Sequence, residues 1–273
     1  MLPGDVVLDV FTELDTSAGL TTAQVRLVRS TDHGNNWSGP ITIGPDLQAL
    51  GTSDPKTGKG VRDGADIVSV SVAPGGVVYV AWQDSRFSGG QHDGIALSHS
   101  ADGGLTWSTP VAVNADASVQ AFTPTVHVDT SGVVAVTYYD LRNNAAAFFG
   151  LFLADCWMVT SSDGTTFQET HLSGPFDLDE APDANGLFLG DYQSLSSAGG
   201  SLLPFYVQTD AAGAAVHTDA FIALPPAPGA AHAASLGAGF AARAAPGAGP
   251  TAAVRERLSQ RIALRRAQRR LQP

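Results

Sequence analysis

Short runs in which apolar and polar residues alternate are separated by turn residues over the first 224 positions of this 273-residue chain. One group of runs reads "ADIVSVSVAPGG", "VVYVAWQDSR", "DGIALSHSADGG" and "LTWSTPVAVN", and a second group of four follows it. Alternation with a period of two predicts β-strands, and clusters of Gly, Asp, Asn and Ser predict tight turns between them. The pattern therefore predicts an all-β chain of antiparallel strands.

The runs also recur as larger units. "VYVAWQDSR", "VAVTYYDLR" and "LPFYVQTD" hold the same place in three successive units, about 55–70 residues apart. A shorter unit precedes them, so four units are visible, the first without an inner strand and the last without an outer one. Four-stranded sheets that repeat around an axis make a β-propeller. We predict a β-propeller of about four visible blades in residues 1–224.

An eight-residue turn occurs twice, as "STDHGNNW" at 30–37 and "SADGGLTW" at 100–107, and a shortened copy, "SSDGTTF", lies at 161–167. Its Gly can adopt a positive φ, and its Asp can accept hydrogen bonds from the N–H groups of the turn. Its aromatic residue is expected to fill apolar space between sheets. We predict a structural role for Ser30, Asp32, Gly34, Trp37, Ser100, Asp102, Gly104, Trp107, Asp163, Gly164 and Phe167.

These turns resemble the Asp-box (BNR) repeats of the sialidase superfamily, and "WQDSR" at 82–86 is similar to a strand end in many bacterial secreted sialidase-like proteins. The resemblance implies a propeller fold, a carbohydrate ligand, and a location outside the cell or on its surface. Sialidase propellers have six blades, so we expect a chain that is incomplete at its N-terminus; a complete small propeller is the alternative. The start, "MLPGDVVLDV", lacks the pattern of a signal peptide.

The resemblance also implies a site on the face opposite the Asp boxes. That face receives two crossings between units, the first crossing at 59–66 and the second crossing at 176–192. In sialidases, arginines bind the substrate carboxylate, a Tyr is the nucleophile, and carboxylates assist it. The substrate-binding candidates are Arg62, Arg86, Arg142, Asp84 and Asp140. The catalytic candidates are Tyr192, Asp191 and Glu180, with Tyr139, Glu13, Asp63 and Asp66 as further candidates.

Other readings of these residues stay open. The Phe/Tyr-Arg-Ile-Pro motif of the family is absent, and Asp-x-Arg recurs at one place in the unit, which also fits a local ion pair. Tyr192 also fits an aromatic residue at the edge of the core. Two functions follow: a sialidase-like glycoside hydrolase that acts on or binds terminal sialic acid or a related acidic sugar, or a non-catalytic propeller that binds glycans or proteins or serves as a scaffold.

Charge is divided unevenly along the chain. Residues 1–230 hold seven Lys and Arg against 25 Asp and Glu, which argues against nucleic acid as a partner. The second crossing is acidic, with Asp177, Asp179, Glu180 and Asp183, and could bind Ca²⁺ through its carboxylates. It lacks the spacing of an EF-hand loop, so a solvated acidic loop is the alternative. We expect no metal or other cofactor.

The end of the chain has a different composition. Residues 225–250 are rich in Ala, Gly and Pro, which predicts a flexible linker. In residues 251–273, Val254, Leu258 and Ile262 recur at helical spacing among many Arg residues, which predicts a short basic helix. This helix could be solvated, contact an anionic surface, or dock on the acidic propeller.

Overall fold

The computed structural model describes residues 2, 4–16, 22–144, 150–209 and 218–223. The predicted linker and basic helix, residues 225–250 and 251–273, lie outside the described residues.

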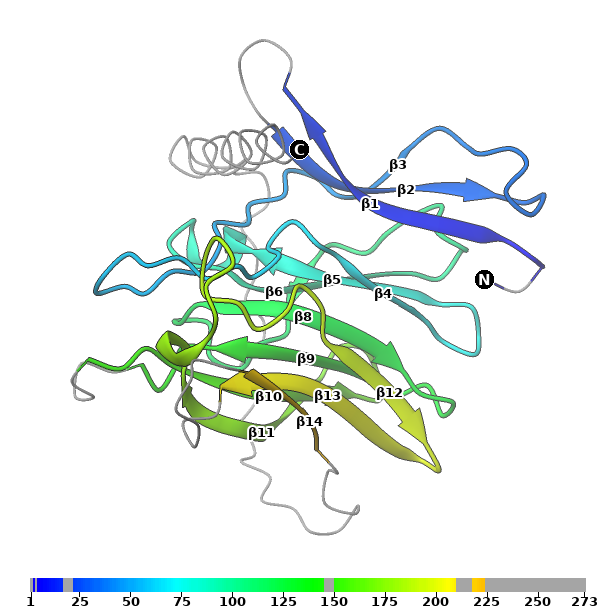
Figure 1. Cartoon of the computed structure of the whole chain (residues 1–273). Coiled ribbons are helices and arrows are strands. Elements are labelled where there is room, and N and C mark those ends of the chain that lie inside the picture. The colour runs from blue at the N-terminus through cyan, green and yellow to red at the C-terminus, as the bar shows by residue number, and fades with distance from the viewer. Residues whose placement is uncertain (1, 3, 17–21, 145–149, 210–217, 224–273) are drawn as a thin grey trace.

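Four antiparallel sheets make up nearly all the regular structure of the described residues (Figure 1). Sheet 1 contains β1 (Val7–Asp15), β2 (Thr22–Ser30) and β3 (Ile41–Gly44), and sheet 2 contains β4 (Ser69–Val72), β5 (Val78–Asp84), β6 (Gly94–Ser100) and β7 (Val111–Ala112). Sheet 3 contains β8 (Ala121–Val128), β9 (Val134–Asp140), β10 (Leu153–Ser161) and β11 (Gln168–Asp177). Sheet 4 contains β12 (Ser194–Ala198), β13 (Ser201–Thr209) and β14 (Thr218–Ile222). The described residues also include two short 3-10 turns, η2 (Ser85–Ser88) and η3 (Leu178–Glu180). The prediction of an all-β, antiparallel chain is confirmed.

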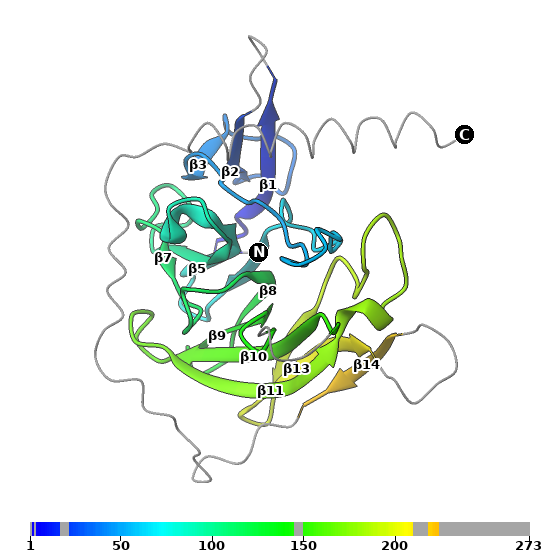
Figure 2. The same ribbon diagram turned by 90° about the vertical axis from the view of Figure 1, so that its left-hand side faces the viewer.

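The sheets have three, four, four and three strands in chain order. Among the described residues, sheet 1 has no counterpart of the first strand of the four-stranded pattern, and sheet 4 has no counterpart of the last. Figure 2 shows that they follow one another around an arc, from β1–β3 through β5 and β9 to β13 and β14. Consecutive sheets therefore pack face to face.

A hydrophobic core lies between each pair of neighbouring sheets, because alternate residues of one strand point to opposite faces. Leu27 and Trp82 pack between sheets 1 and 2, and Ile95 and Tyr138 pack between sheets 2 and 3. Tyr206 joins the core between sheets 3 and 4. Burying a large apolar side chain contributes about 1.5–3 kcal/mol relative to exposing it, so these interfaces hold the sheets together.

The two ends of the strands carry different connections. The three similar turns at 30–37, 100–107 and 161–167 follow β2, β6 and β10, and they lie at the end of the sheets on the right of Figure 1. The crossings lie at the opposite end, on the left, where Val61 pairs with Leu187 in a parallel bridge. We call this end the crossing face.

These turns have the predicted hydrogen bonds to Asp and the predicted positive φ at Gly. Ser30 Oγ donates to Asp32 Oδ1 at 2.8 Å, and the backbone N–H of Asn36 donates to the same oxygen at 2.8 Å. Hydrogen bonds from Asn36, first its side chain, lower the pKa of Asp32 to about 2. Gly34 and Gly104 have φ values of 88° and 89°, where a side chain would be strained. Each turn is thus built from contacts within itself.

The aromatic residues of these turns are placed differently. Trp107 packs on the core between sheets 1 and 2, and Phe167 packs on the core between sheets 2 and 3. Trp37 is 44% exposed, so the expectation that it fills apolar space between sheets is wrong. The reason is its position, because the described residues contain no sheet before sheet 1 against which Trp37 could pack.

Candidate functional site

The two crossings meet at an ion pair on the crossing face. Arg62 Nε and Nη2 lie 3.0 and 2.7 Å from Asp191 Oδ1 and Oδ2, a bidentate arrangement. The backbone brings them together, because Arg62 N donates to Leu187 O at 2.9 Å. A Cβ at Gly186 would lie 2.9 Å from Arg62 N, so this close approach requires glycine.

The remaining atoms of the Arg62 guanidinium contact two residues of the second crossing. Cζ lies 4.6 Å from the centre of the Phe188 ring, and Nη1 lies 3.4 Å from the Ala184 carbonyl oxygen. The hydrogen bonds to Asp191 raise the pKa of Arg62. The side chains of Arg62 and Asp191 remain 40% and 24% exposed, so the pair is held in place but reachable from solvent.

A cavity of about 70 Å³ lies beside this ion pair. Its lining residues are Asp63, Gly64, Ile67, Val68, Ser69, Thr123, Pro124, Thr125, Asp191, Tyr192 and Gln193. Tyr192 is 73% exposed, which excludes a place at the edge of the core. The buried Oε1 and Nε2 of Gln193 have no hydrogen-bond partner in the structure. An unpaired buried amide is costly, so a ligand or water that satisfies it is favoured here.

A network of buried polar groups surrounds Asp63, one of the residues that line the cavity. Asp63, 4% exposed, accepts hydrogen bonds from Thr52 N at 2.6 Å and from Gln83 Nε2 at 3.1 Å. The same Gln83 nitrogen lies 3.3 Å from Oδ2 of the fully buried Asp93. Thr123, at a φ of 51°, donates from Oγ1 to Asp63 O at 3.0 Å. This network fixes the floor of the cavity.

Asp93 connects the segment before the first crossing to sheets 2 and 3. Its carboxylate accepts hydrogen bonds from the backbone N–H groups of Leu50 and Gly51, each at 2.8 Å. Burial, with a further contribution from the Asp63 charge, raises the pKa of Asp93 to about 6, although these hydrogen bonds act in the opposite direction. The sequence analysis did not identify Asp93, Gln83 or Gln193. Asp93 lies in "QHDG" and Gln193 in "GDYQ", which predict only turns, and Gln83 lies in a run that predicts only a strand.

The first Asp-x-Arg is a local ion pair. Arg86 Nη2 lies 2.7 Å from Asp84 Oδ2, and the Asp84 side chain is fully buried. Trp82 Nε1 also donates to Asp84 at 2.8 Å. Arg86 Nη2 contacts the carbonyl oxygens of Pro45 and Asp46 at 3.1 and 3.3 Å. Arg86 therefore attaches the segment after β3 to the end of β5.

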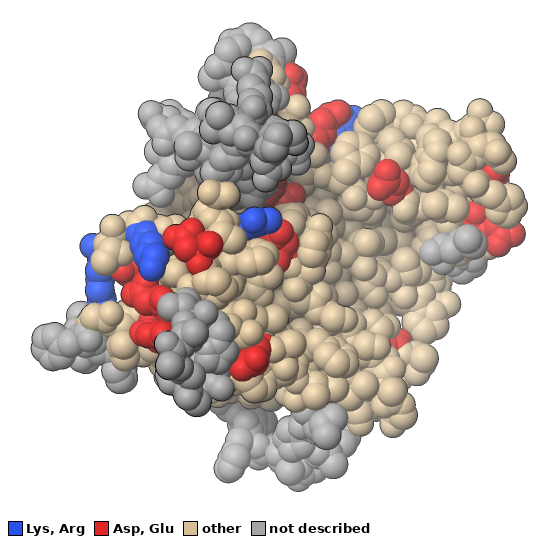
Figure 3. All heavy atoms as spheres, viewed as in Figure 1, with Lys and Arg blue, Asp and Glu red and all other residues tan. Residues whose placement is uncertain are grey.

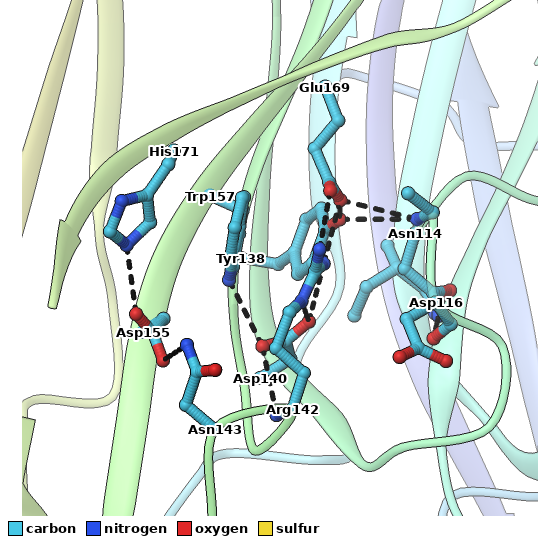
Figure 4. Close-up of polar contacts among 12 residues, drawn as sticks. Asn114, Asp116, Tyr138, Asp140, Arg142, Asn143, Asp155, Trp157, Glu169 and His171 are labelled. Carbon is cyan, nitrogen blue, oxygen red and sulfur yellow. Dashed lines mark hydrogen bonds and ion pairs between the residues drawn. The ribbon is translucent and has the colours of Figure 1, made fainter. Parts of the chain in front are cut away.

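The second Asp-x-Arg belongs to a larger cluster between sheets 2 and 3 (Figure 4). Arg142 Nε donates to Asp140 at 2.7 Å, and its two Nη atoms lie 2.7 and 2.9 Å from the oxygens of Glu169. The guanidinium lies 3.6 Å from the Trp157 ring, and Trp157 Nε1 donates to Asp140 at 3.0 Å. Burial raises the pKa of Asp140 to about 6 despite Arg142.

Tyr138 in this cluster donates its hydroxyl to Glu169. A Tyr beside a carboxylate is the pairing that a sialidase nucleophile needs, and the sequence had suggested the neighbouring Tyr139. Tyr138 is fully buried, and burial with the Glu169 charge raises its pKa well above the ordinary value. Such a hydroxyl is a poor nucleophile and has no access to a substrate.

The other candidates lie apart from the cavity or perform local roles. Tyr139 is 1% exposed and donates its hydroxyl to the Val207 backbone. Glu13 pairs with Arg26 on sheet 1. Glu180 lies in η3. Asp66 accepts a hydrogen bond at its backbone carbonyl from Thr12.

The acidic residues of the second crossing serve separate purposes. Asp177 caps η3, Asp179 pairs with Lys59 at 3.1 Å, and Asp183 accepts the N–H groups of a turn. In the part of the chain that the structure describes, no group of three or more His, Cys, Asp or Glu residues could hold a metal ion.

Of the sequence candidates, the structure brings Arg62, Asp63, Asp191 and Tyr192 together and leaves Arg86 and Arg142 elsewhere.

No protein-family model matches the chain, and no curated protein matches it. Among solved structures, it is similar to the Hadza microbial sialidase Hz136, at 15% identity and a TM-score of 0.48, over 81% of this chain and 42% of that one. It is also similar to a protein of unknown function from Dyadobacter fermentans, at 19% identity and a TM-score of 0.47, over 82% of this chain and 58% of that one. A third similar structure is the alpha-L-arabinanase of Penicillium chrysogenum, at 16% identity and a TM-score of 0.42, over 78% of this chain and 61% of that one. The chain thus spans less than two thirds of each, and the likeness concerns the fold alone.

Proposed function

We propose that this chain is a β-propeller with Asp-box turns, of the sialidase-like glycoside hydrolase type, and that it binds carbohydrate on the crossing face. The observation that supports this most is the cavity beside Arg62 and Asp191. It joins a charged donor and acceptor pair, an unsatisfied buried amide in Gln193, and the exposed ring of Tyr192.

The chemistry of these groups matches that of a sugar. A sugar presents hydroxyl groups that both donate and accept hydrogen bonds, together with an apolar face of C–H groups. The carboxylate of Asp191 accepts hydrogen bonds, and the side-chain amide of Gln193 can both donate and accept them. An exposed aromatic ring such as Tyr192 offers a flat surface to the apolar face. Recognition of a sugar needs these groups in one place, and the crossing face provides them.

The arrangement favours binding over hydrolysis. A glycosidase with two carboxylates needs both of them on either side of the scissile bond. Asp63 lines the cavity but accepts three hydrogen bonds from the protein, and Asp93 is fully buried. The Tyr138–Glu169 pair is buried between sheets. We therefore propose a carbohydrate-binding propeller in which this face is not set up for catalysis.

The test is glycan binding by the purified chain and its Tyr192→Ala variant. We expect wild-type protein to bind members of an immobilised glycan array, and Tyr192→Ala to lose most of that binding because the ring surface is removed. Trp37→Ala is the matched control, since it removes another exposed aromatic from the opposite end of the sheets. Folded wild-type protein that binds no glycan would refute the proposal and favour the scaffold function.

Hydrolysis is measured on the same samples with fluorogenic glycosides, including an α-sialoside. Binding without release of the fluorophore is the expected result. Release that Tyr192→Ala abolishes would instead make the crossing face an active site.

A further inference from the structure

We infer that the crossing face binds a neutral sugar and discriminates against an acidic one, because Asp191 already occupies the position of a ligand carboxylate on Arg62. This inference rests on the proposed carbohydrate binding and names the class of ligand.

The first step is the geometry of Arg62. A guanidinium binds a carboxylate best through two parallel N–H groups. Nε and Nη2 of Arg62 both point to Asp191, at 3.0 and 2.7 Å, and Nη1 faces the Ala184 carbonyl at 3.4 Å. Phe188 covers the plane of the guanidinium. The carboxylate of an acidic sugar would have to displace Asp191, which would then remain close by as a second negative charge.

The second step is the scarcity, among the residues that the structure describes, of other cations that could bind an acidic sugar. On this face, Lys59 pairs with Asp179, and Arg86 and Arg142 pair with buried carboxylates. Lys56 Nζ lies 3.4 Å from the Leu151 carbonyl oxygen. Figure 3 shows the Lys and Arg side chains of this end with Asp or Glu beside them.

The net charge of the chain acts in the same direction. The full chain has a formal net charge of −11 at pH 7, so its overall potential repels anions. The Debye length is about 8 Å at physiological ionic strength, so Asp191 and Asp63 at the cavity still act on a ligand there.

The third step is what the face offers a neutral ligand. A carboxylate oxygen of Asp191 that accepts from Arg62 can still accept from a ligand hydroxyl. Gln193 is one of the residues that line the cavity, and its amide Oε1 and Nε2 have no hydrogen-bond partner in the structure. The cavity, at about 70 Å³, is far smaller than the roughly 300–1,000 Å³ of pockets that enclose a whole ligand. The ring of the sugar would therefore rest on Tyr192, and one hydroxyl or hydroxymethyl substituent would enter the cavity.

The experiment uses glycan pairs that differ only by a terminal acidic sugar, either sialic acid or a uronic acid, measured with the full chain. We expect neutral members to bind at least about tenfold more tightly than their acidic counterparts. Preferential binding of the acidic members would overturn the inference but leave the proposed carbohydrate binding intact. Absence of binding to both members, with a cooperative thermal melt, would refute the proposed function itself, and the inference with it.

A variant tests the role of Asp191 directly. Asp191→Asn releases the Arg62 guanidinium and removes the competing charge, so we expect the affinity for acidic members to rise about tenfold and the preference for neutral members to shrink. Asp179→Asn is the matched control, because it makes the same charge change at another exposed ion pair of this face. An unchanged preference in folded Asp191→Asn, or an equal change in Asp179→Asn, would overturn the inference.

Discussion

The buried carboxylate of Asp93 should make the stability of the protein depend on pH, and the Asp93→Asn variant tests this. The side chain of Asp93 is fully buried between Leu50, Gly51 and the amides of Gln83 and Gln120. Burial raises its pKa to about 6 from 3.8. In the unfolded chain the same carboxyl is exposed to water and titrates near its ordinary value.

The direction of the pH dependence follows from which state, folded or unfolded, holds the proton of Asp93. Between about pH 4 and 6, the folded state keeps the proton of Asp93 and the unfolded state has lost it, so the free energy of unfolding falls as pH rises. The contribution is fully present below about pH 4 and lost above about pH 6. A shift of about two pKa units corresponds to about 3 kcal/mol. Other carboxylates change stability too, so only the difference between wild type and variant isolates Asp93.

The assay is denaturant unfolding of wild type and Asp93→Asn at several pH values from 4 to 7.5. Asn cannot titrate, so the wild type should lose about 3 kcal/mol relative to the variant across this range, whatever constant cost the variant carries. Asp46→Asn, in the same segment but outside the buried network, is the control for charge. Parallel curves for wild type and Asp93→Asn would refute the reasoning.

Two further predictions concern stability. Arg142→Met should lower the free energy of unfolding by about 3–5 kcal/mol, because it leaves Asp140 and Glu169 buried without their cation; a loss below about 1 kcal/mol in denaturant unfolding would contradict this. Trp107→Ala should cost about 3 kcal/mol, whereas Trp37→Ala should cost less than about 1 kcal/mol, because Trp107 packs on a core and Trp37 is 44% exposed. Thermal unfolding of the two variants side by side checks the difference, and equal losses would contradict it.

The parts of the fold that depend on neighbours in sequence could be predicted. Alternation along β5 and β9 identifies strands, because each residue's face is set by its own position. The three similar turns were predictable for the same reason, since Ser30 and Asp32 contact residues within the same turn. The Asp-x-Arg pairs also span only two residues, and the local ion-pair reading of them is confirmed.

The candidate site could not be predicted in the same way, because its contacts join distant segments without a periodic pattern. Arg62 and Asp191 were each singled out, yet nothing in either crossing indicates that residues 129 positions apart form one ion pair. The same holds for Asp93 and the backbone of Leu50, and for Arg142 and Glu169. Such pairings follow from how the sheets pack, and periodicity within one strand does not specify that.

The internal repeat separates residues that build the fold from residues of the candidate site. Val7, Val78 and Val134 each pair with the Ser that begins one of the three similar turns, so the registers of sheets 1, 2 and 3 can be compared directly. Six residues later, Asp84 and Asp140 are both fully buried and pair with the Arg two residues further along, whereas Glu13 is 38% exposed and pairs with Arg26 on the neighbouring strand. The Asp-x-Arg pair therefore recurs in sheets 2 and 3, and what these two sheets share is their packing. Arg62, Asp191 and Tyr192 have no such equivalents, because they lie in crossings of unequal length. The places where the repeat is broken are therefore where selection for a ligand could act without disturbing the fold, and the cavity lined by Asp191 and Tyr192 lies there.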